Sequence, residues 1–175
     1  MGGVYSSVMR FQASFALAFA LCGSGGAGAQ PDALSHLRFL VGDWRAVDTP
    51  AGETGAFTFT LAVQDHIIVR TSEANYAATA DRPASRHDDL LVIFSENGSL
   101  KADYFDNEGH VVRYTVQTPA PKVATFVSDA SARGPRYRLT YRGDAQGALA
   151  GSFEIAAPGS PDAFKPYLSW KAQRR

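Results

Sequence analysis

The chain has 175 residues, and its 17 Lys and Arg residues balance its 17 Asp and Glu residues, so its formal net charge is zero. This balance excludes a basic arm that binds nucleic acid and a strongly polybasic membrane binder. Hydrophobic residues make up 45% of the chain and charged residues 19%, which is typical of globular rather than disordered proteins. The length fits one domain with a substantial core.

The first thirty residues have the features of a secretory signal peptide. Arg10 supplies a positive charge, residues 11–21 form an apolar run, and residues 27–29 are small, as at cleavage sites. We therefore expect a signal peptide over residues 1–29 and a single mature domain over residues 30–175.

Cleavage between Ala29 and Gln30 would remove Cys22, the only cysteine of the chain. The mature protein would then have no disulfide and no thiol chemistry, and core packing alone would supply its stability. The apolar run is shorter than the ~20 residues of a membrane-spanning helix. We therefore expect export to the periplasm or to the outside of the cell, with no transmembrane segment in the mature chain. An uncleaved anchor and a lipidated Cys22 are the alternatives.

A short helix is expected at the start of the mature chain, over residues 31–41. Leu34, Leu37 and Leu40 recur at a spacing that places them on one helical face, and Gly42 is a typical helix stop. A helix of about ten residues is not stable alone, so it must pack on the rest of the domain.

The residues that follow alternate between apolar and polar, which is the period of a β-strand. Phe57, Phe59 and Leu61, for example, alternate with Thr58 and Thr60. Ten strand-like runs, mostly separated by turn-forming residues, cover residues 43–48, 57–63, 66–77, 87–96, 100–106, 110–118, 123–129, 136–142, 148–156 and 167–173. Ten short strands in series predict an all-β fold, an antiparallel up-and-down β-barrel with the short helix capping one end.

One hairpin can be aligned residue by residue. A three-residue turn that ends at Gly109, in the left-handed conformation, places Asp106 opposite His110 and Tyr104 opposite Val112. This register keeps apolar side chains together on one face, so we predict it over a four-residue turn, which would mix the two faces.

Tyrosines dominate the strand faces that we expect to point into the barrel. A buried tyrosine brings an apolar ring and a hydroxyl that needs a partner, so such an interior suits a small amphipathic ligand. The candidate ligand-binding residues are Tyr104, Tyr114, Tyr137, Tyr141, Phe57, Phe59 and Trp170. The alternative is that these side chains only fill the core.

Residues 39–45 (FLVGDWR) resemble the start of the barrel in the calycin superfamily, which includes lipocalins, fatty-acid-binding proteins and nitrobindin-like proteins. In these families a short helix leads into a Gly-x-Trp, and the Trp packs at the closed end of the barrel, often against an Arg of the last strand. The resemblance implies structural roles for Gly42 and Trp44. Candidate partners of Trp44 in the final strand are Lys171, Arg174 and Arg175. The likeness runs from about residue 34 to the C-terminus, and the chain is also similar to secreted bacterial domains of this build.

The chain departs from the individual families in their ligand motifs. The Thr-Asp-x-x-Tyr signature of lipocalins is absent. Fatty-acid-binding proteins hold a carboxylate with Arg-x-Tyr, whereas Arg113 and Tyr114 are adjacent and therefore lie on opposite faces. Nitrobindin-like proteins ligate haem through a His in the C-terminal part of the barrel, and no His follows His110 here. We therefore expect no haem and no other cofactor.

Histidines with nearby carboxylates are the candidate catalytic residues. Asp106 and His110 flank one turn and could orient an imidazole as a general base, and His87 shares a strand face with Asp89. No histidine pair has a dedicated metal-ligand spacing, so no metal site is expected.

Three functions remain open at this stage. The leading expectation is an exported, non-enzymatic protein that binds a small, mostly apolar molecule in a Tyr-lined barrel lumen. A small-molecule enzyme would use a His–carboxylate pair inside the barrel. An envelope protein-interaction module would have a filled barrel and act through loops such as 81–87 or 158–166. An open lumen favours the first function, a histidine in the lumen the second and a filled lumen the third.

Overall fold

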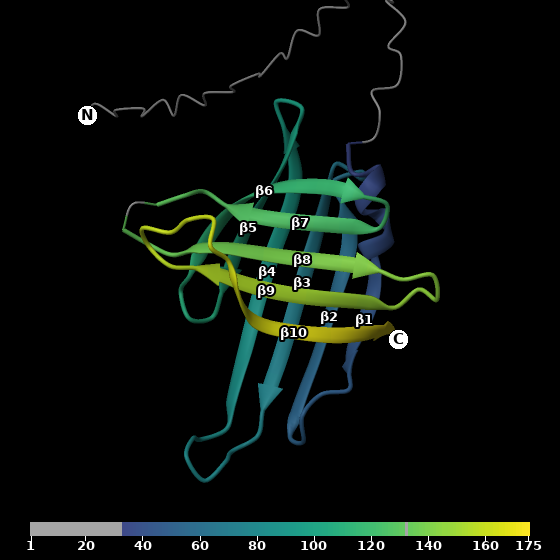
Figure 1. Cartoon of the computed structure of the whole chain (residues 1–175). Coiled ribbons are helices and arrows are strands. Elements are labelled where there is room, and N and C mark those ends of the chain that lie inside the picture. Colours follow the sequence, from purple (N-terminus) through teal and green to yellow (C-terminus); the bar gives the residue numbers. More distant parts are fainter. Residues whose placement is uncertain (1–32, 132) are drawn as a thin grey trace, which may run out of the picture.

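The computed structural model describes residues 33–131 and 133–175, so the predicted signal peptide lies outside the described residues. In this part of the chain, ten antiparallel strands follow one another and close into a barrel in which β1 pairs with β10 (Figure 1). The strands are β1 (Gly42–Val47), β2 (Glu53–Ala62), β3 (Ile67–Tyr76), β4 (Ser85–Glu96), β5 (Ser99–Asp106), β6 (Val111–Ala120), β7 (Val123–Ser128), β8 (Arg136–Gly143), β9 (Leu149–Ala156) and β10 (Lys165–Arg174). The prediction of an all-β, closed up-and-down barrel of ten strands is confirmed, and it is consistent with a calycin-like barrel.

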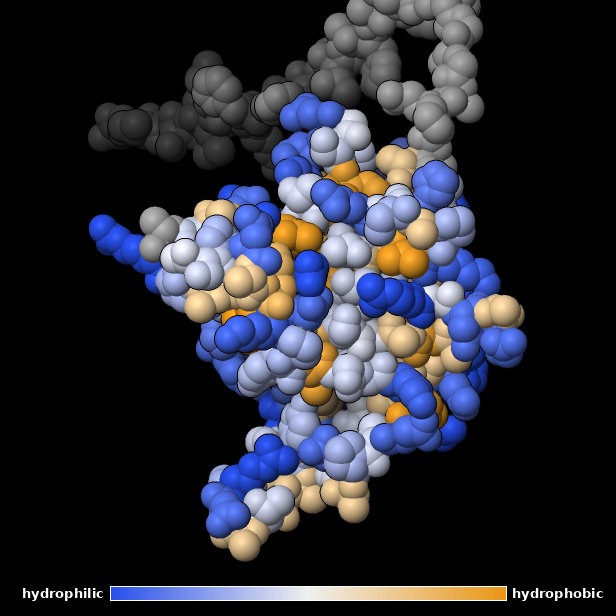
Figure 2. All heavy atoms as spheres, in the orientation of Figure 1, coloured by the Kyte–Doolittle hydropathy of each residue, from blue (hydrophilic) through white to orange (hydrophobic). Residues whose placement is uncertain are grey.

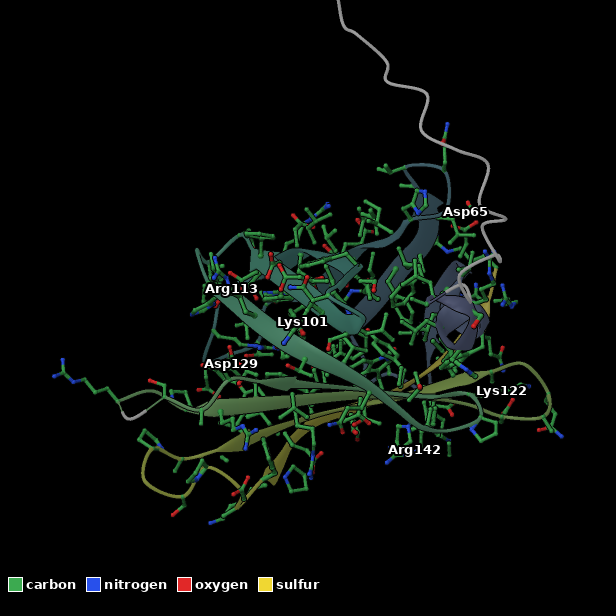
Figure 3. All side chains as sticks on the ribbon, turned by 90° about the horizontal axis from the view of Figure 1, so that it is seen from above. Asp65, Lys101, Arg113, Lys122, Asp129 and Arg142 are labelled. Atoms are coloured by element: carbon green, nitrogen blue, oxygen red, sulfur yellow. The ribbon has the colours of Figure 1, made fainter. Side chains whose placement is uncertain are left out.

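The barrel has two facing walls. In Figure 1, β6 to β10 cross in front of β2 to β5, and β2, β3 and β4 extend beyond the other strands at one end. Side chains from both walls fill the space between them, whereas the labelled Arg113, Lys122 and Arg142 lie toward the outside (Figure 3). Closure gives each of these ten strands a neighbour on both sides, which limits the sheet edge that is open to another chain.

The connections between strands alternate between two ends of the barrel, because consecutive strands run in opposite directions. We call one end the helix end; it carries the turns that follow β2, β4, β6 and β8. The other is the loop end, with the connections after β1, β3, β5, β7 and β9. The segment before β1 lies against the helix end, where Arg38 pairs with Asp65 at 3.5 Å and Phe39 packs beside Gly143.

The predicted capping helix over residues 31–41 is not confirmed, and residues 31 and 32 lie outside the described part of the chain. The structure has instead a six-residue 3-10 helix, η1 (Ser35–Leu40). Leu34, Leu37 and Leu40 are nevertheless all buried, as predicted. Their spacing of three residues matches the three residues per turn of a 3-10 helix better than the 3.6 of an α-helix, which explains the difference.

The Gly-x-Trp segment closes the junction between the first and last strands. Trp44 is 1% exposed, and its Nε1 donates a hydrogen bond to the Leu40 carbonyl at 2.7 Å. Of the three candidate partners in the final strand, Arg174 is the one whose guanidinium lies over the Trp44 ring, 4.5 Å from its centroid. Arg174 also donates to the Val41 carbonyl at 3.0 Å. Gly42, at φ 137°, leaves the space for this guanidinium, because a Cβ there would overlap it.

The predicted hairpin register is confirmed. Tyr104 lies opposite Val112, and the Asp106 backbone N–H donates to the His110 carbonyl at 3.3 Å. Gly109 has a φ of 88°, the left-handed conformation expected for the end of this turn.

The face of the molecule drawn in Figure 2 is mostly hydrophilic. On the face drawn in Figure 2, apolar residues lie in small separate areas among charged and polar ones. No helix within residues 33–131 and 133–175 is long and apolar enough to cross a membrane.

Candidate functional site

A buried aromatic core packs between the two walls of the barrel. It consists of Trp44, Phe57, Phe59, Phe126 and Tyr141, each at most 8% exposed. Tyr141 lies at its centre, in edge contact with Phe59 at 5.5 Å and with Phe126 at 6.2 Å between ring centroids. Three of the predicted ligand-binding residues, Phe57, Phe59 and Tyr141, therefore pack against one another and against Trp44.

A second group of aromatic side chains is only half-buried. Tyr137 on β8 stacks on Phe153 on β9, with 5.7 Å between ring centroids. Trp170 on β10 lies over Gly151, where any side chain would overlap its ring, and meets Tyr141 edge-on at 5.8 Å. We call Tyr137, Phe153 and Trp170 the aromatic wall. All three pack against the buried core, yet each remains partly exposed.

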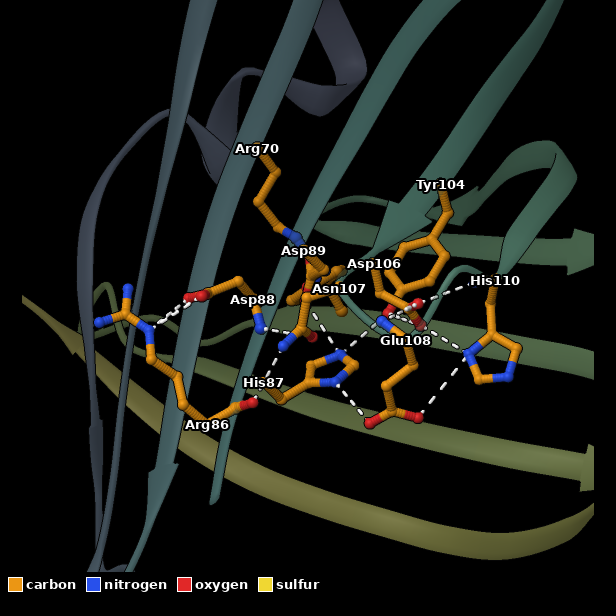
Figure 4. Close-up of polar contacts among 11 residues, drawn as sticks. Arg70, Arg86, His87, Asp88, Asp89, Tyr104, Asp106, Asn107, Glu108 and His110 are labelled. Carbon is orange, nitrogen blue, oxygen red and sulfur yellow. Dashed lines mark hydrogen bonds and ion pairs between the residues drawn. The ribbon is translucent and has the colours of Figure 1, made fainter. Parts of the chain in front are cut away.

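The remaining predicted tyrosines lie on the other side of the lumen. Tyr114 on β6 is 4% exposed and meets Phe126 edge-on at 6.2 Å. Tyr104 on β5 is half-buried and belongs to a group of polar side chains near the loop end. We call this group the polar cluster; its members are Arg70, His87, Asp89, Tyr104, Asp106, Glu108 and His110 (Figure 4).

Arg70 on β3 is a buried cation that the sequence pattern does not reveal. It is 6% exposed, and its guanidinium donates to the Tyr141 hydroxyl and pairs with the carboxylate of Asp89. Burial alone would lower the pKa of Arg70, but the interactions with Tyr141 and Asp89 outweigh it and hold that pKa above its usual range. Among the described residues, Arg70 Nε is the one buried side-chain nitrogen or oxygen without a hydrogen-bond partner.

No signal in the sequence could have placed Arg70 inside. The start of β3 has apolar residues on both faces, with Ile67 and Val69 on one and Ile68 on the other. Alternation therefore does not show which face points inward. Only the pairing of Arg70 with Leu91 on one side and Phe59 on the other identifies its face as the inner one.

His87 connects the inner face of β4 to the loop end. Its Nε2 lies 3.0 Å from the Tyr104 hydroxyl and 3.8 Å from the Asp89 carboxylate. Its Nδ1 lies 3.3 Å from the carboxylate of Glu108, in the turn between β5 and β6. The His87 side chain is 30% exposed, so solvent and small molecules can reach it.

Asp106 organises the turn between β5 and β6. Its Oδ1 accepts the backbone N–H groups of Glu108 and His110, at 3.0 and 2.9 Å, and its Oδ2 lies 2.9 Å from His110 Nδ1. Burial alone would raise the pKa of Asp106, but hydrogen bonds from His110 and Glu108 outweigh it and lower that pKa. The hydrogen bond to Asp106 raises the pKa of His110, whose side chain is 61% exposed.

Tyr104 joins the two halves of the polar cluster. Besides its contact with His87, the Tyr104 hydroxyl lies 3.3 Å from Asp106 Oδ2. Burial raises the pKa of Tyr104, with the charges of Asp89 and Asp106 adding to the effect, so the hydroxyl keeps its proton. The structure thus brings His87 and His110 into one hydrogen-bonded group, a relation that the spacing along the chain does not indicate.

The arginines of β8 point outward. Arg138 forms two hydrogen bonds of 2.7 Å with Glu154, and Arg136 pairs with Asp162 at 2.7 Å. The pairing with Glu154 raises the pKa of Arg138 and, reciprocally, lowers that of Glu154. Both guanidinium groups lie near the ring of Phe164, beside a hollow of about 420 Å³ on the outer surface.

Within the described parts of the chain, no group of three or more His, Cys, Asp and Glu residues has an arrangement that could hold a metal ion. Comparison with known proteins adds no family: no protein-family model matches the chain, and no curated protein matches it.

Proposed function

We propose that the protein is an exported binder of a small, mostly apolar molecule, held near the loop end between the aromatic wall and the polar cluster. The observation that carries this proposal is the difference in burial along the lumen. Side chains of the aromatic core are almost fully buried, whereas Tyr104, Tyr137, Phe153 and Trp170 face inward but are half-buried. Inward-facing aromatic area that remains partly exposed is area that a ligand can cover.

The position of the ligand follows from what fills the rest of the barrel. Because the aromatic core is closely packed, the ligand would lie in the half-buried region beside it. Phe57, Phe59 and Tyr141 would then lie beneath the ligand, at the bottom of the binding site. The aromatic wall on β8 to β10 and the polar cluster on β3 to β5 lie on opposite sides of the ten-strand ring. A flat, apolar molecule with one polar group would therefore meet rings on one side and His87 or Tyr104 on the other.

Export is part of the same proposal. Arg10, the apolar run at residues 11–21 and the small residues at 27–29 support a cleaved signal peptide. The mature chain would then have no cysteine and would depend on the aromatic core and barrel closure for stability.

A fluorescence titration tests the proposal with N-phenyl-1-naphthylamine, an uncharged probe whose emission rises in apolar surroundings. We expect saturable binding, and we expect Phe153→Ala to raise the Kd about tenfold, because it removes aromatic area from the wall. Phe105→Ala is the matched control, since Phe105 is 40% exposed on the outside of the same barrel and should leave the Kd unchanged. Equal Kd values for the two variants, or no saturable binding, would overturn the proposal.

Acid–base catalysis on a small molecule is the second candidate, because His87 faces the lumen and shares a hydrogen bond with Tyr104. A histidine that is accessible and backed by a proton-carrying hydroxyl can act as a general acid or base. Incubation with a metabolite extract, followed by mass spectrometry, would detect turnover by the native protein that His87→Gln abolishes. A bound but unchanged molecule would support the binder instead.

A further inference from the structure

Tyr104 has one proton and two acceptors within reach. Its hydroxyl lies 3.0 Å from His87 Nε2 and 3.3 Å from Asp106 Oδ2 (Figure 4). A phenol donates one hydrogen bond at a time, so the proton points either to His87 or to Asp106. Because burial raises the pKa of Tyr104, the proton stays on the hydroxyl and only its direction changes.

The protonation state of His87 decides that direction. We expect the neutral ring to carry its proton on Nδ1, because Nδ1 lies 3.3 Å from the Glu108 carboxylate, whereas the carboxylate near Nε2, Asp89, is 3.8 Å away and already pairs with Arg70. Nε2 is then an acceptor for Tyr104. When His87 is protonated, Nε2 also carries a proton and must donate to the Tyr104 oxygen. The hydroxyl of Tyr104 then turns to Asp106, which is ionised and accepts.

Asp106 transmits the change to His110. Its Oδ2 accepts a hydrogen bond from His110 Nδ1 at 2.9 Å and can also accept one from the Tyr104 hydroxyl, which lies 3.3 Å away. When the Tyr104 proton turns to Asp106, the carboxylate charge is better satisfied and holds the His110 proton less strongly. Protonation of one histidine therefore opposes protonation of the other, through Tyr104.

We propose that His87, Tyr104, Asp106 and His110 form one proton-coupled relay that makes the site near the loop end sensitive to pH. The coupling is a property of the protein alone, whereas its effect on a ligand rests on the proposed function. A ligand group beside His87 would face a hydrogen-bond acceptor when His87 is neutral and a hydrogen-bond donor when His87 is protonated.

The relay has a defined electrostatic setting. The charged and titratable groups around its histidines are Glu108 in the turn, Asp89 on β4 and Arg70 on β3, in addition to the relay members themselves. Arg70 neutralises Asp89, so Glu108 is the nearby carboxylate without a fixed cation. Across the opening, Tyr76 at the end of β3 lies within electrostatic reach of Glu108.

Histidine NMR titrations of the unliganded protein test the coupling. We expect Asp106→Asn to move the His87 titration curve in the native background, and we expect Tyr104→Phe to remove most of that response. Direct charge effects through space persist in both backgrounds, so only the difference reports the hydroxyl. Asp103→Asn is the matched control, because Asp103 lies on the outer face of β5 opposite Arg113. An equal response to Asp106→Asn with and without the Tyr104 hydroxyl would overturn the relay.

A second measurement needs no variant. The ¹⁵N shifts of neutral His87 identify its tautomer, and we expect the proton on Nδ1. If neutral His87 carried its proton on Nε2, it would donate to Tyr104 in both the neutral and the protonated state. The direction of the Tyr104 proton would then not change with pH, and this result would overturn the relay.

The probe titration separates the relay from the ligand. The Kd of N-phenyl-1-naphthylamine, measured on both sides of the His titration range, should change with pH in the native protein and change much less in Tyr104→Phe. A pH-independent Kd with a normal NMR response would refute the regulatory role alone. The absence of saturable binding would overturn the proposed function and leave the relay standing.

Discussion

Arg70 is the residue whose position most constrains the interior. A guanidinium taken out of water is tolerated when a partner charge and hydrogen bonds compensate for its lost hydration. Asp89 supplies the charge and Tyr141 the additional hydrogen bond. Tyr141 in turn stands at the centre of the aromatic core, so one side chain links the polar cluster to the apolar packing.

Removal of the carboxylate beside Arg70 should be strongly destabilising. We expect Asp89→Ala to lower the free energy of unfolding by about 3–5 kcal/mol, because it leaves a buried cation unpaired. Urea denaturation measures this against Asp88→Ala, whose side chain is 44% exposed and pairs with Arg86 at the surface. Asp88→Ala should lower the free energy of unfolding by at most about 1 kcal/mol. Similar losses for both variants would show that Asp89 does not compensate a buried charge.

At the scale of elements, the hairpin formed by β5 and β6 carries most of the polar cluster. Its register places Tyr104 and Asp106 on the inner face, and Asp106 holds the turn through two backbone N–H groups. The turn is therefore a structural connection that also supplies members of the polar cluster.

The stability of this hairpin should pass through a maximum in mildly acidic solution. The pKa of Asp106 is lowered from 3.8, so its contribution is present above that value and is lost as the pH falls through the folded pKa. The pKa of His110 is raised from 6.5, so its contribution is complete below that value and is lost as the pH rises through the folded pKa. Melting temperatures measured across this range should fall on both sides.

Asp106→Asn provides the check on this pH dependence. It removes the charge to which His110 responds, so the decrease in melting temperature above the unfolded pKa of His110 should become shallower. An unchanged profile would assign the pH dependence to other groups. Glu73→Asn is a suitable control, because Glu73 is an exposed carboxylate that pairs with Arg86 on the outer face.

At the scale of the whole molecule, closure depends on the junction between β1 and β10. Trp44 joins the aromatic core, the last residue of η1 and the last strand, through contacts with Phe57, Leu40 and Arg174. A side chain that is 1% exposed and contacts three separate parts of the chain stabilises the barrel as a unit.

Replacement of Trp44 should therefore cost more than replacement of the other tryptophan. We expect Trp44→Ala to lower the free energy of unfolding by about 3–5 kcal/mol, because it opens a cavity at the junction. Trp170→Ala should cost less, since Trp170 is already half-buried rather than enclosed. Chemical denaturation followed by circular dichroism compares the two variants, and a larger loss for Trp170→Ala would contradict the role of Trp44 in closure.

The order and number of strands and the hairpin register at Gly109 were predictable from the sequence, whereas the calycin resemblance narrowed the partner of Trp44 to three residues, of which the structure selects Arg174. These features depend on local patterns, namely a period of two, turn-forming residues and a short motif, which act over a few residues. The same local information placed the leucines of η1 on one face but did not specify the type of helix, because a spacing of three residues suits both helical forms over so short a segment.

Alternating apolar residues and turn-forming residues along the chain were sufficient to predict a ten-strand barrel with inward-facing tyrosines. The folded barrel was needed to show which of those tyrosines pack in the core. It was also needed to show that Arg70 meets Tyr141, 71 residues away, and that His87 meets Glu108, 21 residues away. Barrel closure brings these side chains together across the interior, so strand shear and side-chain packing, rather than residue spacing, select which groups meet.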